Sequence, residues 1–379
     1  MHILAVDIGT GTQDILLFDA RLDAENNFKL VLPSPTMMVR RKIESATRRK
    51  VTIALHGVTM GGGPCAWAIE AHLKAGLKVF ATPPAARTLN DDLDAVQETG
   101  IQVIGESELA GLSPSVERIE MRDFDFHAIR RAFAEFGVSL DDLSAVAVAV
   151  FDHGAAPLDV SDRQFRFDYL DERIRAENRL SAFAFPAERI PAIMTRLQAV
   201  ADSAGALPAP LIVMDTAPAA VLGAALDPFV AVQPQAVIAN VGNFHTLAFR
   251  LGTAGIEGVF EHHTGLLDRP ALEQLLRGLA AGTLTHAEVF NHHGHGALLY
   301  QHHALQLGPR DTPLVVTGPR RSLLRGSSLQ PYFASPYGDM MIAGCFGLVS
   351  AAADHLPHLG ESVLEALQSS RDIAPWDVA

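Results

Sequence analysis

The chain has 379 residues, of which 48% are hydrophobic and 19% are charged, a composition typical of a folded globular protein with two domains or a duplicated pair. Its formal net charge of −13 disfavours nucleic acid and anionic membranes as partners, because an acidic surface repels both. The two cysteines are too few for a disulfide framework, and no apolar run is long enough to span a membrane, so we expect a cytoplasmic protein.

The chain opens on an apolar run, a glycine-rich turn and a second apolar run, which predicts two strands joined by a tight turn. The turn region reads Asp7-Ile-Gly9-Thr10-Gly11-Thr12-Gln13-Asp14. Glycines allow such a turn to present its N–H groups to an anion at close range. A carboxylate beside that anion can hold hydrated Mg²⁺. The segment therefore predicts either a phosphate loop, with Asp7 as the metal ligand, or an ordinary hairpin.

Strands alternate with helices through the first half of the chain, so the predicted fold class is α/β. The polar segment Ser161–Asn178 is expected as an insertion or a crossing helix, and Ala206–Pro210 as a linker. We expect an N-terminal domain at 1–205 and a C-terminal domain at 206–379. The expected strands are His2–Asp7, Asp14–Asp19, Phe28–Leu32, Val51–Leu55, Leu77–Ala81, Ile101–Ile104 and Ala145–Phe151, and the expected helices are Pro64–Ala75, Leu89–Thr99, Phe126–Phe136 and Ala187–Ser203.

The second half of the chain repeats this pattern. An apolar strand at Leu211–Asp215 and an alanine-rich helix at Ala217–Leu226 precede a strand at Ala236–Val241. A turn at Gly242-Asn243 and a returning strand at Phe244–Leu251 follow. Two similar strand–turn–strand units on two α/β domains could close on one ligand from opposite sides.

Five segments of the chain, in this order, resemble the actin-like ATPase superfamily, which contains sugar and acetate kinases, the heat-shock 70 chaperones and actin. The resemblance implies two RNase H-like domains with a nucleotide held in the cleft between them. The segments are Asp7–Asp14 for the first phosphate loop, Pro218–Leu226 for an alanine-rich helix, Asn240–Thr246 for the second phosphate loop, Val315–Arg321 for the adenosine strand and turn, and Asp339–Ala352 for the final helix of small residues.

This resemblance implies ATP and Mg²⁺ as cofactors. Asp7 would hold Mg²⁺ through water, and Gly318 would border the base. The implied phosphate contacts are Gly9, Thr10, Gly11, Thr12 and Gln13 in the first loop, and Asn240, Gly242, Asn243 and Thr246 in the second.

The chain also departs from the superfamily pattern. Asn240 replaces the usual Asp of the second loop, and Asn243-Phe244 stands where glycines usually allow phosphate to approach. Pro319 follows Gly318 in place of a second glycine and removes a backbone donor. Ala217 stands where the chaperones carry their catalytic Glu, although Asp215 lies two residues earlier.

Asp152-His153-Gly154 follows a strongly apolar strand, where α/β sheets place ligands. Asp152 is a candidate base or water-orienting residue for phosphoryl transfer, and the alternative is that its side chain caps the following turn. Asp14 and Asp215 are the other candidate catalytic carboxylates. His153 and Gly154 are candidate substrate contacts.

Eight of the 16 histidines fall in four short segments of the second half of the chain, and they are His245, His262, His263, His292, His293, His295, His302 and His303. Neutral imidazole is a common transition-metal ligand, but neighbours on a strand face opposite sides, so His262 and His263 cannot both face one ion. The spacing matches no dedicated zinc motif. These histidines are therefore expected either to bind a metal or to face solvent or substrate, with His245, His263 and Thr264 as candidate substrate contacts.

The stretch from His56 to Pro64 contains Gly61, Gly62 and Gly63 between a predicted strand and a predicted helix. Glycines before a helix N-terminus predict an anion site. A tight connection that ends on a first-turn proline is the alternative.

Four segments together also resemble a family of archaeal and bacterial proteins often labelled as pyruvate formate-lyase activating enzymes. A radical-SAM activase needs three cysteine thiolates for its [4Fe–4S] cluster. The chain has two cysteines, so we expect it not to be such an activase. The four segments are Asp7–Asp14, Asp152–Gly154, Glu261–Gly265 and Pro336–Asp339.

The leading hypothesis is an ATP-dependent small-molecule kinase or a related ATP-using enzyme. A second hypothesis keeps the fold and replaces ATP chemistry by a metal or an organic ligand at the histidines. A third is a nucleotide-dependent sensor or activator that acts on a partner protein. The acceptor and the oligomeric state are left open by the sequence.

Overall fold

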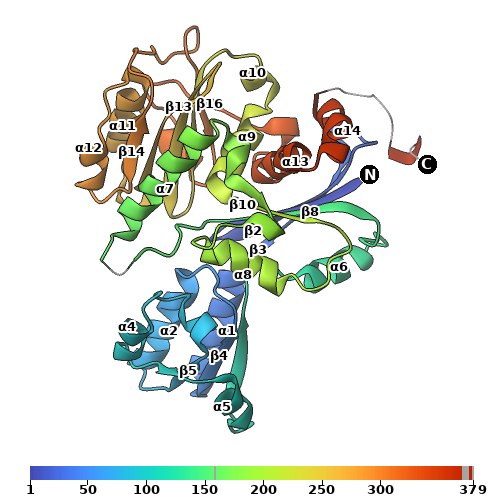
Figure 1. Cartoon of the computed structure of the whole chain (residues 1–379), viewed down its shortest axis with the longest axis vertical. Coiled ribbons are helices and arrows are strands. Elements are labelled where there is room, and N and C mark those ends of the chain that lie inside the picture. The colour runs from blue at the N-terminus through green and yellow to red at the C-terminus, as the bar shows by residue number, and fades with distance from the viewer. Residues whose placement is uncertain (158, 369–374, 378–379) are drawn as a thin grey trace.

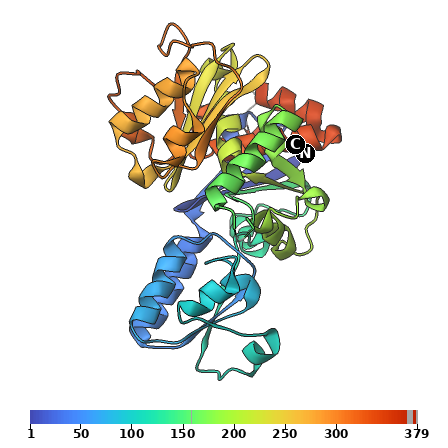
Figure 2. The ribbon, with the colours of Figure 1, turned by 60° about the vertical axis from the view of Figure 1, so that its left-hand side comes forward.

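The fold, seen in a computed structural model, consists of three α/β bodies, and the predicted α/β class is confirmed (Figure 1). The structure describes residues 1–157, 159–368 and 375–377. Two six-stranded sheets form the larger part of the molecule, and a four-stranded sheet forms a small lobe that extends away from them in both views (Figure 1, Figure 2). Within the described residues, none of the helices combines the length and the apolar character needed to cross a bilayer.

The first sheet has the strand order β3-β2-β1-β8-β10-β9. Strands β1 to β3 form an antiparallel meander, and β8 and β10 run parallel to β1. The sequence of β8 is a continuous run of small apolar residues because helices cover both of its faces. The bounds are β1 (His2–Ile8), β2 (Thr12–Asp19), β3 (Phe28–Pro33), β8 (Leu143–Val150), β9 (Ala184–Pro186) and β10 (Leu211–Asp215).

The second sheet has the order β14-β13-β12-β11-β15-β16. Strands β11 to β13 are an antiparallel meander, β15 runs parallel to β11, and β16 runs parallel to β15. When the edge strands β9 and β14 are left out, the five remaining strands of each sheet can be numbered 1 to 5 along the chain. Both sheets then have the order 3-2-1-4-5 and the same strand directions. The bounds are β11 (Ala236–Val241), β12 (His245–Gly252), β13 (Gly255–His263), β14 (Gly296–Leu299), β15 (Leu314–Thr317) and β16 (Tyr332–Phe333).

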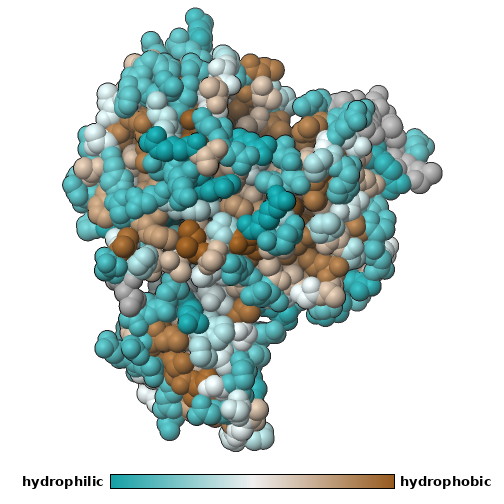
Figure 3. Space-filling model, in the orientation of Figure 1, coloured by the Kyte–Doolittle hydropathy of each residue, from teal (hydrophilic) through white to brown (hydrophobic). Residues whose placement is uncertain are grey.

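The small lobe is built by the chain from α1 to β7, which follows β3. Its strands are all parallel, in the order β6-β5-β4-β7, and it has an apolar core of its own. Its surface carries a broad patch of apolar residues in the view of Figure 3. The bounds are α1 (Pro35–Arg49), β4 (Ile53–Gly57), α2 (Pro64–Lys74), β5 (Val79–Ala81), α3 (Pro83–Ala86), α4 (Leu93–Glu98), β6 (Gln102–Val103), α5 (Glu106–Gly111) and β7 (Glu117–Met121).

The other helices cover the two larger sheets and connect them. Helices α6, α8, α13 and α14 belong to the first sheet's core, and α7 crosses to β14 of the second sheet, as expected for a crossing helix at Ser161–Asn178. The bounds are α6 (Phe126–Ala134), α7 (Asp162–Ala176), α8 (Thr195–Ser203), α9 (Thr216–Ala225), α10 (Pro228–Ala231), α11 (Arg269–Ala281), α12 (His286–Phe290), α13 (Ala343–His355) and α14 (Pro357–Gln368), with short 3-10 turns at Ala24–Asn26, Leu180–Phe183, Ala187–Arg189, Thr264–Leu266, Arg321–Leu324, Pro336–Gly338 and Pro375–Asp377.

Two expectations about the middle of the chain need correction. The expected strand at Leu211–Asp215 forms, but it pairs with β8 in the first sheet. The chain therefore leaves the first sheet after this strand, and not at the expected boundary of 205/206. The expected helix Ala187–Ser203 forms only from Thr195 onward. Pro191 explains the late start, because a proline cannot donate to a helix and holds the preceding Ile190 extended.

Helices α9 and α13 cross in close contact between the sheets. A Cβ atom on Gly223 of α9 would overlap the carbonyl oxygen of Ala343, and one on Gly347 of α13 would overlap that of Ala219. The small residues that mark both helices in the sequence are therefore needed at this crossing. Helix α13 returns from the second half of the chain to cover β1 and β2.

Candidate functional site

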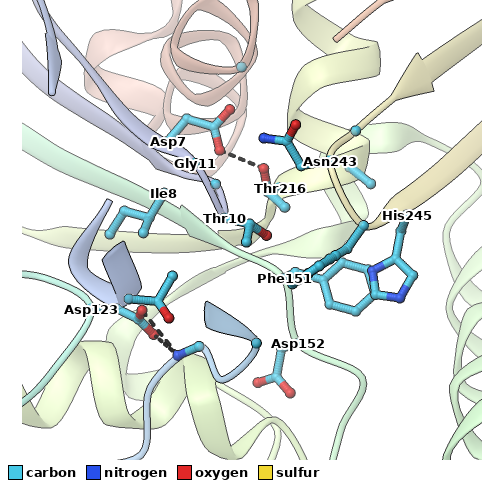
Figure 4. Close-up of a pocket in the computed structure, with 18 of the residues that line it drawn as sticks. Asp7, Ile8, Thr10, Gly11, Asp123, Phe151, Asp152, Thr216, Asn243 and His245 are labelled. Atoms are coloured by element: carbon cyan, nitrogen blue, oxygen red, sulfur yellow. Dashed lines mark hydrogen bonds between the residues drawn. The ribbon is translucent and has the colours of Figure 1, made fainter. Parts of the chain in front are cut away.

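A cavity of about 410 Å³ lies where the three bodies meet. The β1–β2 turn, the β11–β12 turn and the glycine-rich loop of the small lobe all line it (Figure 4). The predicted site residues that line this cavity are Asp7, Gly9, Thr10, Gly11, Thr12, Asp14, Asp152, His153, Gly154, Asn240, Gly242, Asn243, His245 and Gly318.

The first turn joins β1 to β2 and has free backbone donors. The N–H of Gly9 donates to the carbonyl oxygen of Thr12 at 2.9 Å, while the carbonyl oxygens of Thr10 and Gly11 accept bonds from Ser34 at the start of α1. In the described part of the chain, the N–H groups of Thr10 and Gly11 have no acceptor. This turn can therefore offer backbone donors to an anion in the cavity.

Two carboxylates lie beneath the first turn, on opposite strands of one register pair. Asp7 accepts a hydrogen bond of 2.5 Å from Oγ1 of Thr216, at the start of α9 (Figure 4). Burial raises the pKa of Asp7 to about 6, and burial together with the charge of Asp7 raises the pKa of Asp14 to about 8. Oδ1 of Asp14 is buried and has no hydrogen-bond partner in the part of the chain that the structure describes. Carboxylate oxygens suit Mg²⁺, and these two residues fit such an ion.

The second turn joins β11 to β12 and is closed by Gly242 N–H donating to the carbonyl oxygen of His245 at 3.0 Å. The side chain of Asn243 in this second turn lies against Gly11 of the first turn. A Cβ atom on Gly11 would lie 2.9 Å from Nδ2 of Asn243, so the two turns face each other almost in contact. Phe244 packs edge-on against Trp67 of the small lobe, with ring centroids 5.6 Å apart.

The adenosine turn expected after β15 also reaches the cavity. Gly318 has φ of 97°, a conformation that favours glycine. A Cβ atom there would lie 2.6 Å from the carbonyl oxygen of Val241. Gly318 and Pro319 therefore form a wall of the cavity beside the second turn.

Asp152 has the contacts of a turn and helix cap. One carboxylate oxygen accepts the N–H of Gly154 at 2.8 Å, and the other accepts the N–H groups of Arg196 and Leu197 at 2.9 Å, at the first turn of α8. These contacts match the alternative in which the side chain of Asp152 caps the following turn. The role of base for Asp152 stays a prediction.

Five other predicted site residues do not line the cavity. Gln13 donates to the carbonyl oxygen of Pro33 at 3.1 Å, and the buried hydroxyls of Thr246 and Thr264 bond to each other at 2.9 Å. Asp215 caps α9 through the N–H of Ala217 and pairs with Arg166. The fifth residue, His263, belongs to a separate histidine cluster.

Arg196 is a cavity residue that sequence reasoning missed. Its guanidinium pairs with Asp123 at 2.7 Å and donates to the carbonyl oxygen of Phe151 at 2.6 Å. Asp123 in turn accepts the N–H of Gly61 at 3.2 Å (Figure 4). The carboxylate of Asp123 thus ties the glycine-rich loop to Arg196. It takes up the N–H of Gly61, one of the donors that the sequence predicted for a bound anion. No motif or spacing marks Arg196 in advance.

His245, His263 and His295 come together at the second sheet. One ring nitrogen from each lies within 4.8 Å of the others. His245 and His263 are direct partners across β12 and β13, whereas the buried His262 bonds to the carbonyl oxygens of His263 and His292. The expectation that His262 and His263 point apart is therefore confirmed.

The two cysteines do not fit an iron–sulfur cluster. Cys65 is buried in α2 of the small lobe, and Cys345 is buried in α13, where its thiol donates to the carbonyl oxygen of Asp14 at 3.1 Å. Burial raises the pKa of Cys65 to about 11 and that of Cys345 well above its ordinary value. Two protonated thiols in separate elements cannot supply the thiolates that such a cluster requires.

Comparisons with known proteins give a matching family model and similar solved structures. No curated protein matches the chain. A solved structure titled as an exopolyphosphatase-like protein is 10% identical and covers 99% of this chain and 92% of its own, with a TM-score of 0.26, which does not establish a shared fold. The family model described as "Putative pyruvate format-lyase activating enzyme (DUF1786)" matches residues 60–323, more than half of the chain. The chain therefore belongs to this family.

Proposed function

We propose that this protein binds a nucleotide with Mg²⁺ in the cavity between its two larger sheets and acts as an ATP-dependent phosphotransferase or ATPase. The observation that carries the proposal is the pair of turns that face each other across the cavity, one from each sheet. Both turns join the first and second strands of sheets that share one strand order. This duplication is what the actin-like ATPase resemblance requires.

The first turn supplies the features that a phosphate group needs. Thr10 and Gly11 line the cavity, and within the described residues their N–H groups have no acceptor. Such backbone donors can stabilise anions without a side chain. Asp7 and Asp14 lie directly beneath and would hold Mg²⁺, directly or through water. When bound, Mg²⁺ neutralises charge that develops on a transferring phosphoryl group.

Other residues of the cavity would position the ligand. Thr216 holds the carboxylate of Asp7 in place at 2.5 Å. Gly344 of α13 lies so close that a Cβ atom there would overlap Asp7. Arg87 and Arg196 contribute guanidinium groups to the cavity wall, and that of Arg196 is paired with Asp123. Phosphoryl transfer depends largely on positioning and charge stabilisation, and these residues provide both.

Calorimetric titration with Mg·ATP and Mg·ADP tests this proposal. We expect micromolar binding that needs Mg²⁺ and weakens at least tenfold in Asp7→Ala, because the variant loses a buried metal ligand. Glu188→Ala removes an exposed carboxylate outside the cavity and serves as the matched control. A well-folded wild-type protein that binds neither nucleotide would contradict the proposal.

Turnover separates the two enzyme classes. An ATPase releases ADP and phosphate without an acceptor, whereas a phosphotransferase releases ADP faster when an acceptor is added. Asp152→Asn, assayed alongside, tests the predicted base. The amide keeps only one of the two acceptor oxygens that cap the turn and α8, so a thermal melt checks that the variant is folded. Loss of turnover with unchanged nucleotide affinity would support a role for Asp152 in the reaction.

A further inference from the structure

The histidine cluster is a second group of functional side chains, distinct from the acidic pair beneath the first turn. His245 begins β12, His263 ends β13, and His295 precedes β14. The ring centroids lie 4.7 to 5.0 Å apart, so each imidazole contacts the other two. Three imidazoles in mutual contact, each with a nitrogen within 4.8 Å of the others, could converge on one ion through small ring movements.

The backbone positions these rings from three separate points. Register pairing places His245 opposite His263. His295 joins them because its N–H donates to the carbonyl oxygen of Glu261 at 2.9 Å, which fixes the segment before β14 against β13. Phe151 of the first sheet stacks on His245, with ring centroids 4.4 Å apart (Figure 4). The cluster is therefore held from both sheets.

A buried carboxylate lies behind the cluster. Oε1 of Glu261 and Nδ1 of His295 are both buried, have no hydrogen-bond partner among the described residues, and lie 3.7 Å apart. Oε2 of Glu261 is held by Nε of Arg166 at 2.5 Å. A carboxylate behind a histidine is the usual outer partner of a metal-bound imidazole, because it fixes the ring and leaves the other nitrogen for the metal.

We propose that His245, His263 and His295 bind one divalent transition-metal ion, such as Zn²⁺, at the wall of the cavity. Imidazole ligands favour Zn²⁺, Fe²⁺, Ni²⁺ and Cu²⁺ over Mg²⁺. Three protein ligands leave a tetrahedral ion one position for water or a substrate oxygen. His245 also lines the cavity, so the ion would lie beside the space that we assign to the nucleotide.

Metal titration of the full chain, produced without a histidine tag and stripped with a chelator, tests the site. We expect one Co²⁺ per chain with visible absorption bands, displaced by one Zn²⁺ and not by Mg²⁺. In His263→Ala, affinity should fall on the order of 100-fold or more, since even loss of an outer partner costs about 10–100-fold. Circular dichroism and thermal melting check folding, and His263→Gln, closer in volume, replaces the Ala variant if that unfolds.

His292→Asn is the matched control, since this exposed histidine lies in the same segment but outside the cluster. It should bind Co²⁺ as the wild type does. A folded wild-type protein without visible Co²⁺ bands, or a folded His263 variant with wild-type affinity, would overturn the proposal. Mg·ATP titration of the same variants keeps this result separate from the nucleotide proposal, because the two sites use different ligands.

Discussion

The two turns that face each other across the cavity have similar backbones and different side chains. The first, from Ile8 to Thr12, has two glycines, free N–H groups and a pair of carboxylates beneath it. The second, from Gly242 to His245, has Asn243 and Phe244 at its tip and a histidine cluster beneath it. The two units thus share a strand order and differ in the chemistry of their turns.

This difference divides the cavity into two chemical environments. Oxygen ligands and backbone donors at the first turn suit a hard cation and an anion. Imidazoles at the second turn suit a softer cation. The sheets are joined by Arg166 of α7, which is fully buried and pairs with Asp215 of the first sheet at 2.8 Å and with Glu261 of the second.

Arg166→Met should have the largest effect, because it breaks this link between the two halves. Removing one partner of a buried ion pair leaves charge unpaired and costs about 3–5 kcal/mol, and here two carboxylates lose their partner. We expect a large fall in the free energy of unfolding, measured by denaturant titration. Weakened Co²⁺ affinity should accompany it, since Glu261 would lose the contact that orients it.

Arg175→Met is the control for that prediction, because it lies on the same helix and pairs with Asp171 at an exposed site. An exposed i,i+4 pair of this kind contributes little to stability, because solvent screens the two charges. Equal destabilisation by the two variants would show that Arg166 does not link the sheets in the way the geometry indicates.

The sequence indicates the first turn well because its signals are local. Glycines, alternating apolar runs and the acidic residues at the strand ends lie within one short segment, and the structure brings them together as predicted. The α9 and α13 helices carry an equally local signal, their small residues. Fold class follows from the same kind of pattern.

Other features depend on pairing between distant segments, which no single segment encodes. His295 joins His245 and His263 only because β14 pairs with β13 in one register. Arg196 reaches the cavity, and Arg166 reaches Glu261, from helices without any motif. Asp152 resembles a catalytic residue in sequence while its oxygens cap the following turn and α8. The strand Leu211–Asp215 was predicted, but its parallel pairing with β8 was not.

Gly344→Ala should destabilise the protein less than Arg166→Met, and its effect on binding should be limited to the ligand of the first turn. The added Cβ atom would overlap the carboxylate of Asp7, and overpacking of this kind costs about 1–3 kcal/mol. We expect a lower melting temperature and weaker Mg·ATP binding, with Co²⁺ affinity unchanged. Gly111→Ala, at the end of α5 where a Cβ atom meets open space, is the control and should leave both affinities unchanged. Co²⁺ binding that weakens in step with Mg·ATP binding would mean that the two environments are not separate.

Asn243→Gly should cause the smallest change, a modest rise in nucleotide affinity. This variant tests whether the side chain of the second turn obstructs the approach of phosphate. Because Nδ2 of Asn243 faces Gly11 across the cavity, its removal should allow a closer approach and raise Mg·ADP affinity by about threefold to tenfold, or roughly 1 kcal/mol. Gly11→Ala alone should lower the affinity, since its methyl group would crowd Asn243. If the side chains act through this contact, the double variant should recover most of the loss, and the coupling can be read from a double-mutant cycle. A fall in affinity in Asn243→Gly would mean that the amide binds the ligand, so the second turn would contribute to phosphate recognition through its side chain where the first uses its backbone.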